Sequence, residues 1–176
     1  MGENQPGEAG TVASRRIHAS ALLVGAMAVV IRGASGVGKS ALVLDLLAAL
    51  AAEGRFGRLI GDDQVAVEAS HGRLIVRGVA EIAGLIERRG LGIARVPFEA
   101  AGLVGLVVDL IPGEPRRLPE AIDQRTDLCG ILVRRIAISD SDALKVRSVM
   151  AAIDADLAAP DQMPAPTPES GNPLST

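Results

Sequence analysis

Residues 33 to 40 read Gly-Ala-Ser-Gly-Val-Gly-Lys-Ser, a full match to the phosphate-binding loop pattern G-x-x-x-x-G-K-[ST]. In such a loop the backbone N–H groups surround a polyphosphate, Lys39 reaches the β- and γ-phosphates, and the Ser40 hydroxyl holds Mg²⁺. Only two of the 18 basic residues are lysines, Lys39 and Lys145. A lysine at the one position where the loop needs it is therefore not well explained by chance. The predicted phosphate-binding residues are Gly33, Ala34, Ser35, Gly36, Val37, Gly38, Lys39 and Ser40.

Two adjacent carboxylates, Asp62 and Asp63, follow the next predicted strand after the loop. In a phosphoryl-transfer site an acidic residue either holds Mg²⁺ or accepts the proton of the attacking hydroxyl. Neighbouring side chains at a strand end point to opposite faces, so one of the two normally faces the site. Repulsion between them suits one to general-base work. The alternative is a solvated acidic turn.

Other charged groups lie on either side of these motifs. His18 is on the strand before the loop strand and either faces the phosphates or, as the residue taken alone favours, sits on a strand edge. Residues 87–93 combine Glu87 with two arginines and two glycines. This segment is either a charged turn or a loop that supplies a second Mg²⁺ ligand and neutralises phosphate charge. The pairs Arg116-Arg117 and Arg134-Arg135 are expected on the solvated surface.

The elements that must position these residues follow from the hydrophobic pattern. An apolar run before the loop reads as a buried strand, and the Leu- and Ala-rich run after it reads as a helix. Strand, loop and helix therefore come in the order that puts a helix N-terminus against the phosphates. The predicted strands are 17–24, 27–32, 58–61, 64–69, 73–77, 103–110 and 131–138, and the predicted helices are 40–52, 81–88 and about 139–157. Strands outnumber helices and mix hairpins with a helical crossover, which predicts an α/β fold with a mixed β-sheet and flanking helices.

Length and composition predict one P-loop domain over residues 15–158. A polar, Gly-rich lead (1–14) and a tail (159–176) with five of the ten prolines are predicted to be disordered. Aromatic residues make up 1% of the chain and the net charge is −3. Both observations argue against nucleic-acid binding, which needs stacking platforms or a basic surface.

Cys129 is the only cysteine, so there is no disulfide framework, and a cytoplasmic location is the simplest prediction. Arg15-Arg16 followed by the apolar residues 19–31 superficially resembles an export signal. That apolar run, however, feeds the phosphate-binding loop and is too short to span a bilayer. We therefore expect neither export nor membrane insertion.

Four sequence blocks together resemble the catalytic domain of the HPr kinase/phosphorylase family, in a short form similar to those of alphaproteobacteria. They are His18, the loop 33–40, Asp62 to Val65, and residues 87–93. The last block, Glu-Arg-Arg-Gly-Leu-Gly-Ile, is close to the family signature Glu-x-Arg-Gly-Leu-Gly-Ile. The likeness is strong over residues 17–93 and weaker to about residue 138.

The resemblance implies a fold like that of HPr kinase and phosphoenolpyruvate carboxykinase. It also implies an enzyme that uses ATP and Mg²⁺ to phosphorylate a serine of the carrier protein HPr, in regulation linked to the phosphotransferase system. The same enzyme would remove the phosphate by phosphorolysis and would assemble as a homohexamer. By position, Lys39 would bind the transferring phosphate, Ser40 and Glu87 would hold Mg²⁺, and Asp63 would be the base. His18 and Asp62 would support the site.

Two alternatives remain open from the sequence. One is a small-molecule kinase with the same loop. The other is a nucleotide-binding sensor that signals by contact, which would need the loop and the metal ligands but no base such as Asp63.

Overall fold

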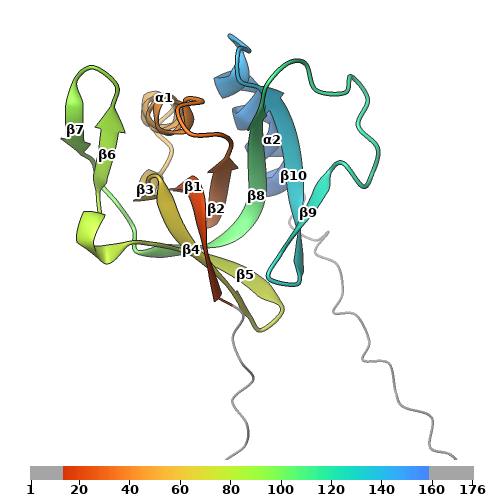
Figure 1. Ribbon diagram of the computed structural model, residues 1–176, viewed down its shortest axis with the longest axis horizontal. Helices are drawn as coiled ribbons and strands as arrows, with labels where there is room; N and C mark the ends of the chain where they lie inside the picture. The colour runs from red at the N-terminus through yellow and green to blue at the C-terminus, as the bar shows by residue number, and fades with distance from the viewer. Residues whose placement is uncertain (1–13, 159–176) are drawn as a thin grey trace, which may run out of the picture.

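The computed structural model describes residues 14–158, in which a curved, mixed β-sheet carries two α-helices (Figure 1). The first half of the chain contains β1 (Ser14–Val24), β2 (Met27–Arg32), α1 (Lys39–Ala52), β3 (Gly57–Gly61), β4 (Gln64–Ser70), β5 (Arg73–Gly78) and the short 3₁₀ helix η1 (Ala80–Ile82). The second half contains β6 (Leu85–Arg88), β7 (Gly92–Arg95), β8 (Ala101–Ile111), β9 (Arg125–Leu128), β10 (Ile131–Ser139) and α2 (Lys145–Ala158). The predicted α/β fold with a mixed sheet and flanking helices is confirmed.

Five of the strands close into a ring. β1 pairs with β2 and β4, β4 pairs with β5, β5 pairs with β8, and β8 pairs back to β2. β3 adds to β1, and β10 continues from β8 to β9. The β2–β8 and β8–β10 pairs are parallel. The carboxyl ends of β2, β8 and β10 therefore meet at one edge of the sheet, where ligands of such sheets bind.

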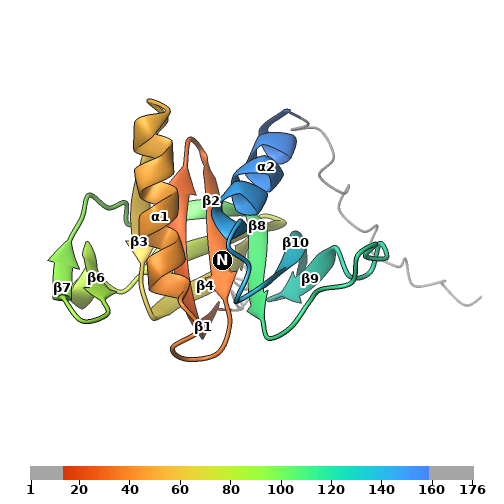
Figure 2. The ribbon, with the colours of Figure 1, turned by 90° about the horizontal axis from the view of Figure 1, so that it is seen from above.

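Alternating side chains on these strands fill two cores, because successive residues of a strand point to opposite faces. Ala21, Val30 and Val107 belong to the cluster inside the ring. Their neighbours Leu22 and Val29 belong to the cluster under the helices. Figure 2 shows α1 and α2 on the same side of the sheet, above that second cluster.

The prediction of a helix over residues 81–88 is wrong. This segment contains η1, a turn at Gly84 and the strand β6, which pairs with β7 in a separate hairpin beside α1 (Figure 1). Gly84 has a φ of 74°, and a Cβ there would lie 3.0 Å from the Val96 carbonyl oxygen. The chain must turn at this residue, so no helix continues through it.

Other boundaries differ less. β7 and β9, of four residues each, were not predicted from the sequence, and the last helix begins at Lys145, later than the predicted start near residue 139. Ser14, assigned to the disordered lead, begins β1, and the rest of the predicted lead and the tail lie outside the described residues. Within residues 14–158, neither helix has the length and apolar character needed to cross a membrane.

Candidate functional site

The phosphate-binding loop joins β2 to α1 at the carboxyl edge of the sheet. Gly38 is the N-cap of α1 with a φ of 100°, a left-handed conformation that favours glycine. No side chain caps this helix. Backbone N–H groups at a helix N-terminus that lack a capping side chain are suited to bind an anion.

Lys39 is buried beneath the loop, with 6% of its surface exposed. Its Nζ donates hydrogen bonds to the carbonyl oxygens of Gly33 (3.1 Å) and Ala34 (2.9 Å). Burial lowers the pKa of Lys39 below its ordinary value, although the charges of Asp63 and Asp62 act in the opposite direction. The ammonium group is thus held at the loop by carbonyl groups that a phosphate can replace as its partners.

His18 connects Lys39 to Asp63. Its Nε2 lies 2.9 Å from Lys39 Nζ, and its Nδ1 lies 3.0 Å from Asp63 Oδ1. A lysine ammonium only donates hydrogen bonds, so Nε2 accepts and Nδ1 carries the proton that points to Asp63. The strand-edge alternative for His18 therefore does not describe its surroundings.

Asp63 lies at the turn between β3 and β4, and 71% of its side chain is exposed. Its φ of 66° is left-handed, a conformation that aspartate and asparagine adopt more easily than most residues. The turn thus presents a carboxylate to solvent while the chain of contacts through His18 holds it toward the loop lysine.

Asp62 is oriented the other way and is 6% exposed. Its Oδ1 accepts hydrogen bonds from the hydroxyls of Ser20 (2.6 Å) and Ser40 (2.8 Å), and its Oδ2 accepts one from the Glu87 backbone N–H (3.3 Å). One carboxylate therefore links β1, the start of α1 and the β6–β7 hairpin.

The β6–β7 hairpin brings residues 87–93 to the same edge. The backbone N–H of Glu87 contacts Asp62, and the side chain of Glu87 is exposed. Arg89 reaches the loop: its Nη2 lies 3.5 Å from the position that a Cβ on Gly36 would occupy. Arg88 is also exposed, and among residues 14–158 it makes no hydrogen bond or ion pair with the loop.

The oxygen donors at this edge suit Mg²⁺. The Ser40 hydroxyl and the Asp62 carboxylate meet there, with the Glu87 backbone N–H beside them, and Mg²⁺ prefers oxygen ligands such as the first two, with phosphates and water completing its shell. Among residues 14–158, no group of three or more His, Cys, Asp or Glu side chains could hold a metal alone.

Sequence reasoning missed a cluster of charged side chains at the same carboxyl edge of the sheet, on the face that lines the ring. Asp109, near the end of β8, accepts hydrogen bonds from Arg32 Nε (2.7 Å) and Nη2 (2.8 Å) and from Arg135. Burial would raise the pKa of Asp109, but the hydrogen bonds and charges of the two arginines outweigh it and hold this pKa below its ordinary value. The sequence held a signal for this cluster, because Asp109 is a charged residue near the end of an apolar run that follows the loop.

The surface assignment is wrong for Arg135, whereas the side chain of Arg134 is 37% exposed but paired. Arg135 is 24% exposed and binds Asp109, while Arg134 is paired with Asp156 and donates to the Ala152 carbonyl oxygen. Neighbours on a strand point to opposite faces, so the two arginines join different parts of the structure. Arg116, with 68% of its side chain exposed, lies on the surface as predicted.

Residues 11–153 match the family described as HPr Serine kinase C-terminal domain. An HPr kinase/phosphorylase of Clostridium tetani (strain Massachusetts / E88) is 37% identical over 82 residues, which are 47% of this chain and 25% of that protein. One from Clostridium beijerinckii (strain ATCC 51743 / NCIMB 8052) is 37% identical over 81 residues, 46% of this chain and 25% of that protein. The match thus spans about a quarter of the length of these curated relatives.

Among solved structures, the HPr(Ser) kinase/phosphatase from Coxiella burnetii superimposes with a TM-score of 0.68 at 22% identity. The superposition covers 84% of this chain and 99% of that one. At this identity the likeness shows a shared fold.

Proposed function

The chain belongs to the HPr Serine kinase C-terminal domain family, and from this membership we propose that it transfers the γ-phosphoryl group of ATP to a serine hydroxyl of HPr. One observation supports the proposal above all. The contacts from Lys39 through His18 to Asp63 join a phosphate-binding ammonium to an exposed carboxylate. A kinase needs both groups close together, one on the phosphoryl group and one on the incoming alcohol.

The proposed roles follow from what each side chain contacts. The incoming serine hydroxyl approaches Asp63 from solvent and gives up its proton to this carboxylate as the oxygen attacks the γ-phosphorus. The loop backbone and Lys39 bind the phosphates and stabilise the charge that develops on them. His18 is a positioning residue that fixes the Lys39 and Asp63 groups relative to each other.

Mg²⁺ would be held by Ser40 and Glu87, with Asp62 orienting the Ser40 hydroxyl through their 2.8 Å hydrogen bond. When bound, the ion neutralises charge on the β- and γ-phosphates. Asp62 also fixes the Glu87 backbone, so a single buried carboxylate would set the positions of both proposed ligands.

The family resemblance extends the proposal to the reverse reaction. Inorganic phosphate would attack phosphoserine and form pyrophosphate, and Asp63 would return a proton to the leaving serine oxygen. We also propose, on the resemblance alone, a role in phosphotransferase-system regulation, a cytoplasmic location and assembly as a homohexamer.

The alternative of a nucleotide sensor has less support. A sensor needs no base, whereas the exposed Asp63 is joined to the loop lysine through His18. A small-molecule kinase would use the same groups and differs only in the acceptor, so the acceptor must be tested directly.

The decisive experiment mixes the protein with Mg²⁺, γ-labelled ATP and purified HPr. We expect label on a serine of HPr, located by mass spectrometry, and no label with the Lys39→Ala variant. Addition of inorganic phosphate should then release the label as pyrophosphate. Nucleotide binding without any label on HPr would contradict the kinase proposal, and label transfer by Lys39→Ala would contradict the assignment of the loop as the catalytic site.

A further inference from the structure

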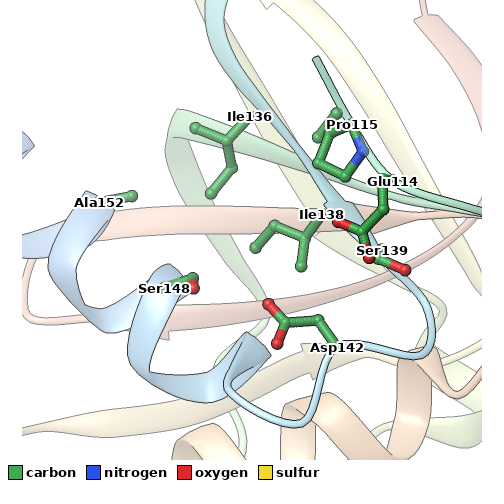
Figure 3. A pocket seen from close by; sticks show the side chains of 9 residues that line it. Glu114, Pro115, Ile136, Ile138, Ser139, Asp142, Ser148 and Ala152 are labelled. Carbon is green, nitrogen blue, oxygen red and sulfur yellow. The ribbon is translucent and has the colours of Figure 1, made fainter. Parts of the chain in front are cut away.

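A cavity of about 270 Å³ lies between the carboxyl end of β10, the loop after β8 and α2. Figure 3 shows Ile136 and Ile138 of β10 on one side and Ala152 of α2 opposite, with Pro115 from the loop above them. These side chains give the cavity apolar walls. The family motifs described above contribute none of its lining.

The rim of the cavity is polar. Ser139, at the end of β10, is 2% exposed, and Asp142 points toward the space between β10 and α2 (Figure 3). One Asp142 oxygen, Oδ1, accepts a hydrogen bond from the Leu144 backbone N–H at 2.7 Å. Glu114 and Ser148 complete the polar groups. Apolar walls with a few convergent polar groups are typical of small-molecule sites, and a volume just under the usual ~300 Å³ suits one ring system.

The register of the parallel strands gives the position of this cavity relative to the loop. Arg32, the last residue of β2, pairs with Asp109 of β8, and Ile111 of β8 pairs with Ser139 of β10. Ser139 thus lies two strands from the start of the loop, or roughly 10 Å at the usual strand spacing. The two acidic residues flanking the loop on the other side, Asp62 and Asp63, lie beyond β1. The triphosphate therefore has its acceptor on one side and this cavity on the other.

We propose that this cavity binds the nucleoside part of the nucleotide whose phosphates occupy the loop. The proposal rests on the proposed function, because it takes the loop as an ATP site. Pro115, Ile136, Ile138 and Ala152 would contact the faces of the base, since the described chain offers no aromatic side chain there. Carboxylates accept hydrogen bonds from ribose hydroxyls, as in dinucleotide-binding sites, and from the amino groups of bases. Asp142 and Glu114 therefore suit the ribose or an exocyclic amine.

Ala152→Phe tests the proposal, because it fills the cavity from α2. Ala151→Phe is the matched control, since Ala151 is the exposed neighbour on the same helix. Calorimetry would measure ATP and inorganic triphosphate binding, each with Mg²⁺, to the full chain and to both variants. We expect Ala152→Phe to weaken ATP binding at least about tenfold, with triphosphate binding within about twofold of the unaltered chain. Ala151→Phe should leave both affinities unchanged.

Other outcomes separate the two proposals. Unchanged ATP affinity in Ala152→Phe, or an equal loss of both ligands, would overturn the nucleoside site and leave the loop assignment standing. An unaltered chain that binds neither ligand would refute the proposed function and this site together.

A measurement on the unaltered protein does not depend on the folding of any variant. Photolabelling with 8-azido-ATP should modify residues within 111–115 or 136–152, and excess ATP should suppress the labelling. Suppressible labelling confined to other segments would overturn the proposal.

Discussion

His18 Nε2 lies 2.9 Å from Lys39 Nζ, so a ring on β1, the strand before the loop strand, accepts a hydrogen bond from the loop lysine itself. The same ring contacts Asp63 through its other nitrogen. The proposed phosphate-binding cation and the proposed base are therefore neighbours through one imidazole, although they are separated by 24 positions along the chain (63 − 39).

Asp63→Asn should preserve nucleotide binding and lower serine phosphorylation by roughly 10²-fold or more, because it removes a general base. Asparagine tolerates the left-handed backbone of this position as aspartate does, so the turn should keep its conformation. Calorimetry for ATP and initial rates with labelled ATP and HPr measure the two effects. Phosphate transfer at the unaltered rate would remove the base role.

His18→Ala should slow phosphate transfer, and its effect should depend on whether Asp63 is present. Residues in one hydrogen-bonded chain usually show interaction energies of about 0.5–3 kcal/mol in double-mutant cycles. The rates of the unaltered chain, His18→Ala, Asp63→Asn and the double variant give this number. Strictly multiplicative effects would mean that His18 does not act through Asp63.

Arg89→Ala should weaken ATP binding or lower the transfer rate, because its guanidinium reaches the loop near Gly36. The expected loss is about tenfold or more, in line with a charge-assisted contact to phosphate of roughly 1.5–3 kcal/mol. Arg88→Ala is the matched control on the same hairpin, since it removes the same charge one residue away. Equal effects of the two variants would indicate a general charge effect and no specific contact of Arg89.

Asp109→Asn should lower the free energy of unfolding by about 3 kcal/mol, because it leaves the guanidiniums of Arg32 and Arg135 facing each other without their carboxylate. Urea unfolding at neutral pH measures this loss, with Asp45→Asn, an exposed carboxylate on α1, as the control. A loss no larger than that of the control would show that the cluster contributes little to stability.

The same cluster predicts a dependence on pH. The folded-state pKa of Asp109 lies below the ordinary 3.8, so its contribution is fully present above that value and is lost as the pH falls through the lowered pKa. The stability difference between the unaltered chain and Asp109→Asn should therefore shrink below about pH 4. A constant difference from pH 7 to pH 2.5 would contradict this assignment.

The sequence predicted the parts of the site that depend on local chemistry. The loop pattern, the apolar strand before it and the helix after it could be read directly, because each is determined by neighbouring residues. The hairpin that carries Glu87 could not be predicted in this way. Its four-residue strands are too short to show the alternating hydrophobic pattern of a strand, and Leu, Ile and Glu also suit a helix. The hairpin turn lies between Arg88 and Gly92. The chain enters β6 through an earlier turn at Gly84, where Val96 and Phe98 lie against the backbone.

Contacts between residues far apart in the chain could not be predicted from the sequence either. Ser20 reads as a small residue in an apolar strand, yet it is fully buried and donates to Asp62, 42 positions away. Arg135 reads as surface charge, and only the pairing of β10 beside β8 brings it to Asp109. Such contacts depend on the topology of the sheet, which a single sequence does not specify.

Closure of the five-stranded ring has a consequence for self-association. Each strand of the ring has a backbone partner on both sides, so the longest strands offer little unpaired edge to a second molecule. The outlying edges belong to β9 and to the separate β6–β7 hairpin, with strands of four residues each, and to β3, of five residues, which the segment around Phe98 already bridges. Copies of this chain would therefore have to recognise one another by side-chain packing and charge, and continuous intermolecular sheets are disfavoured from the start.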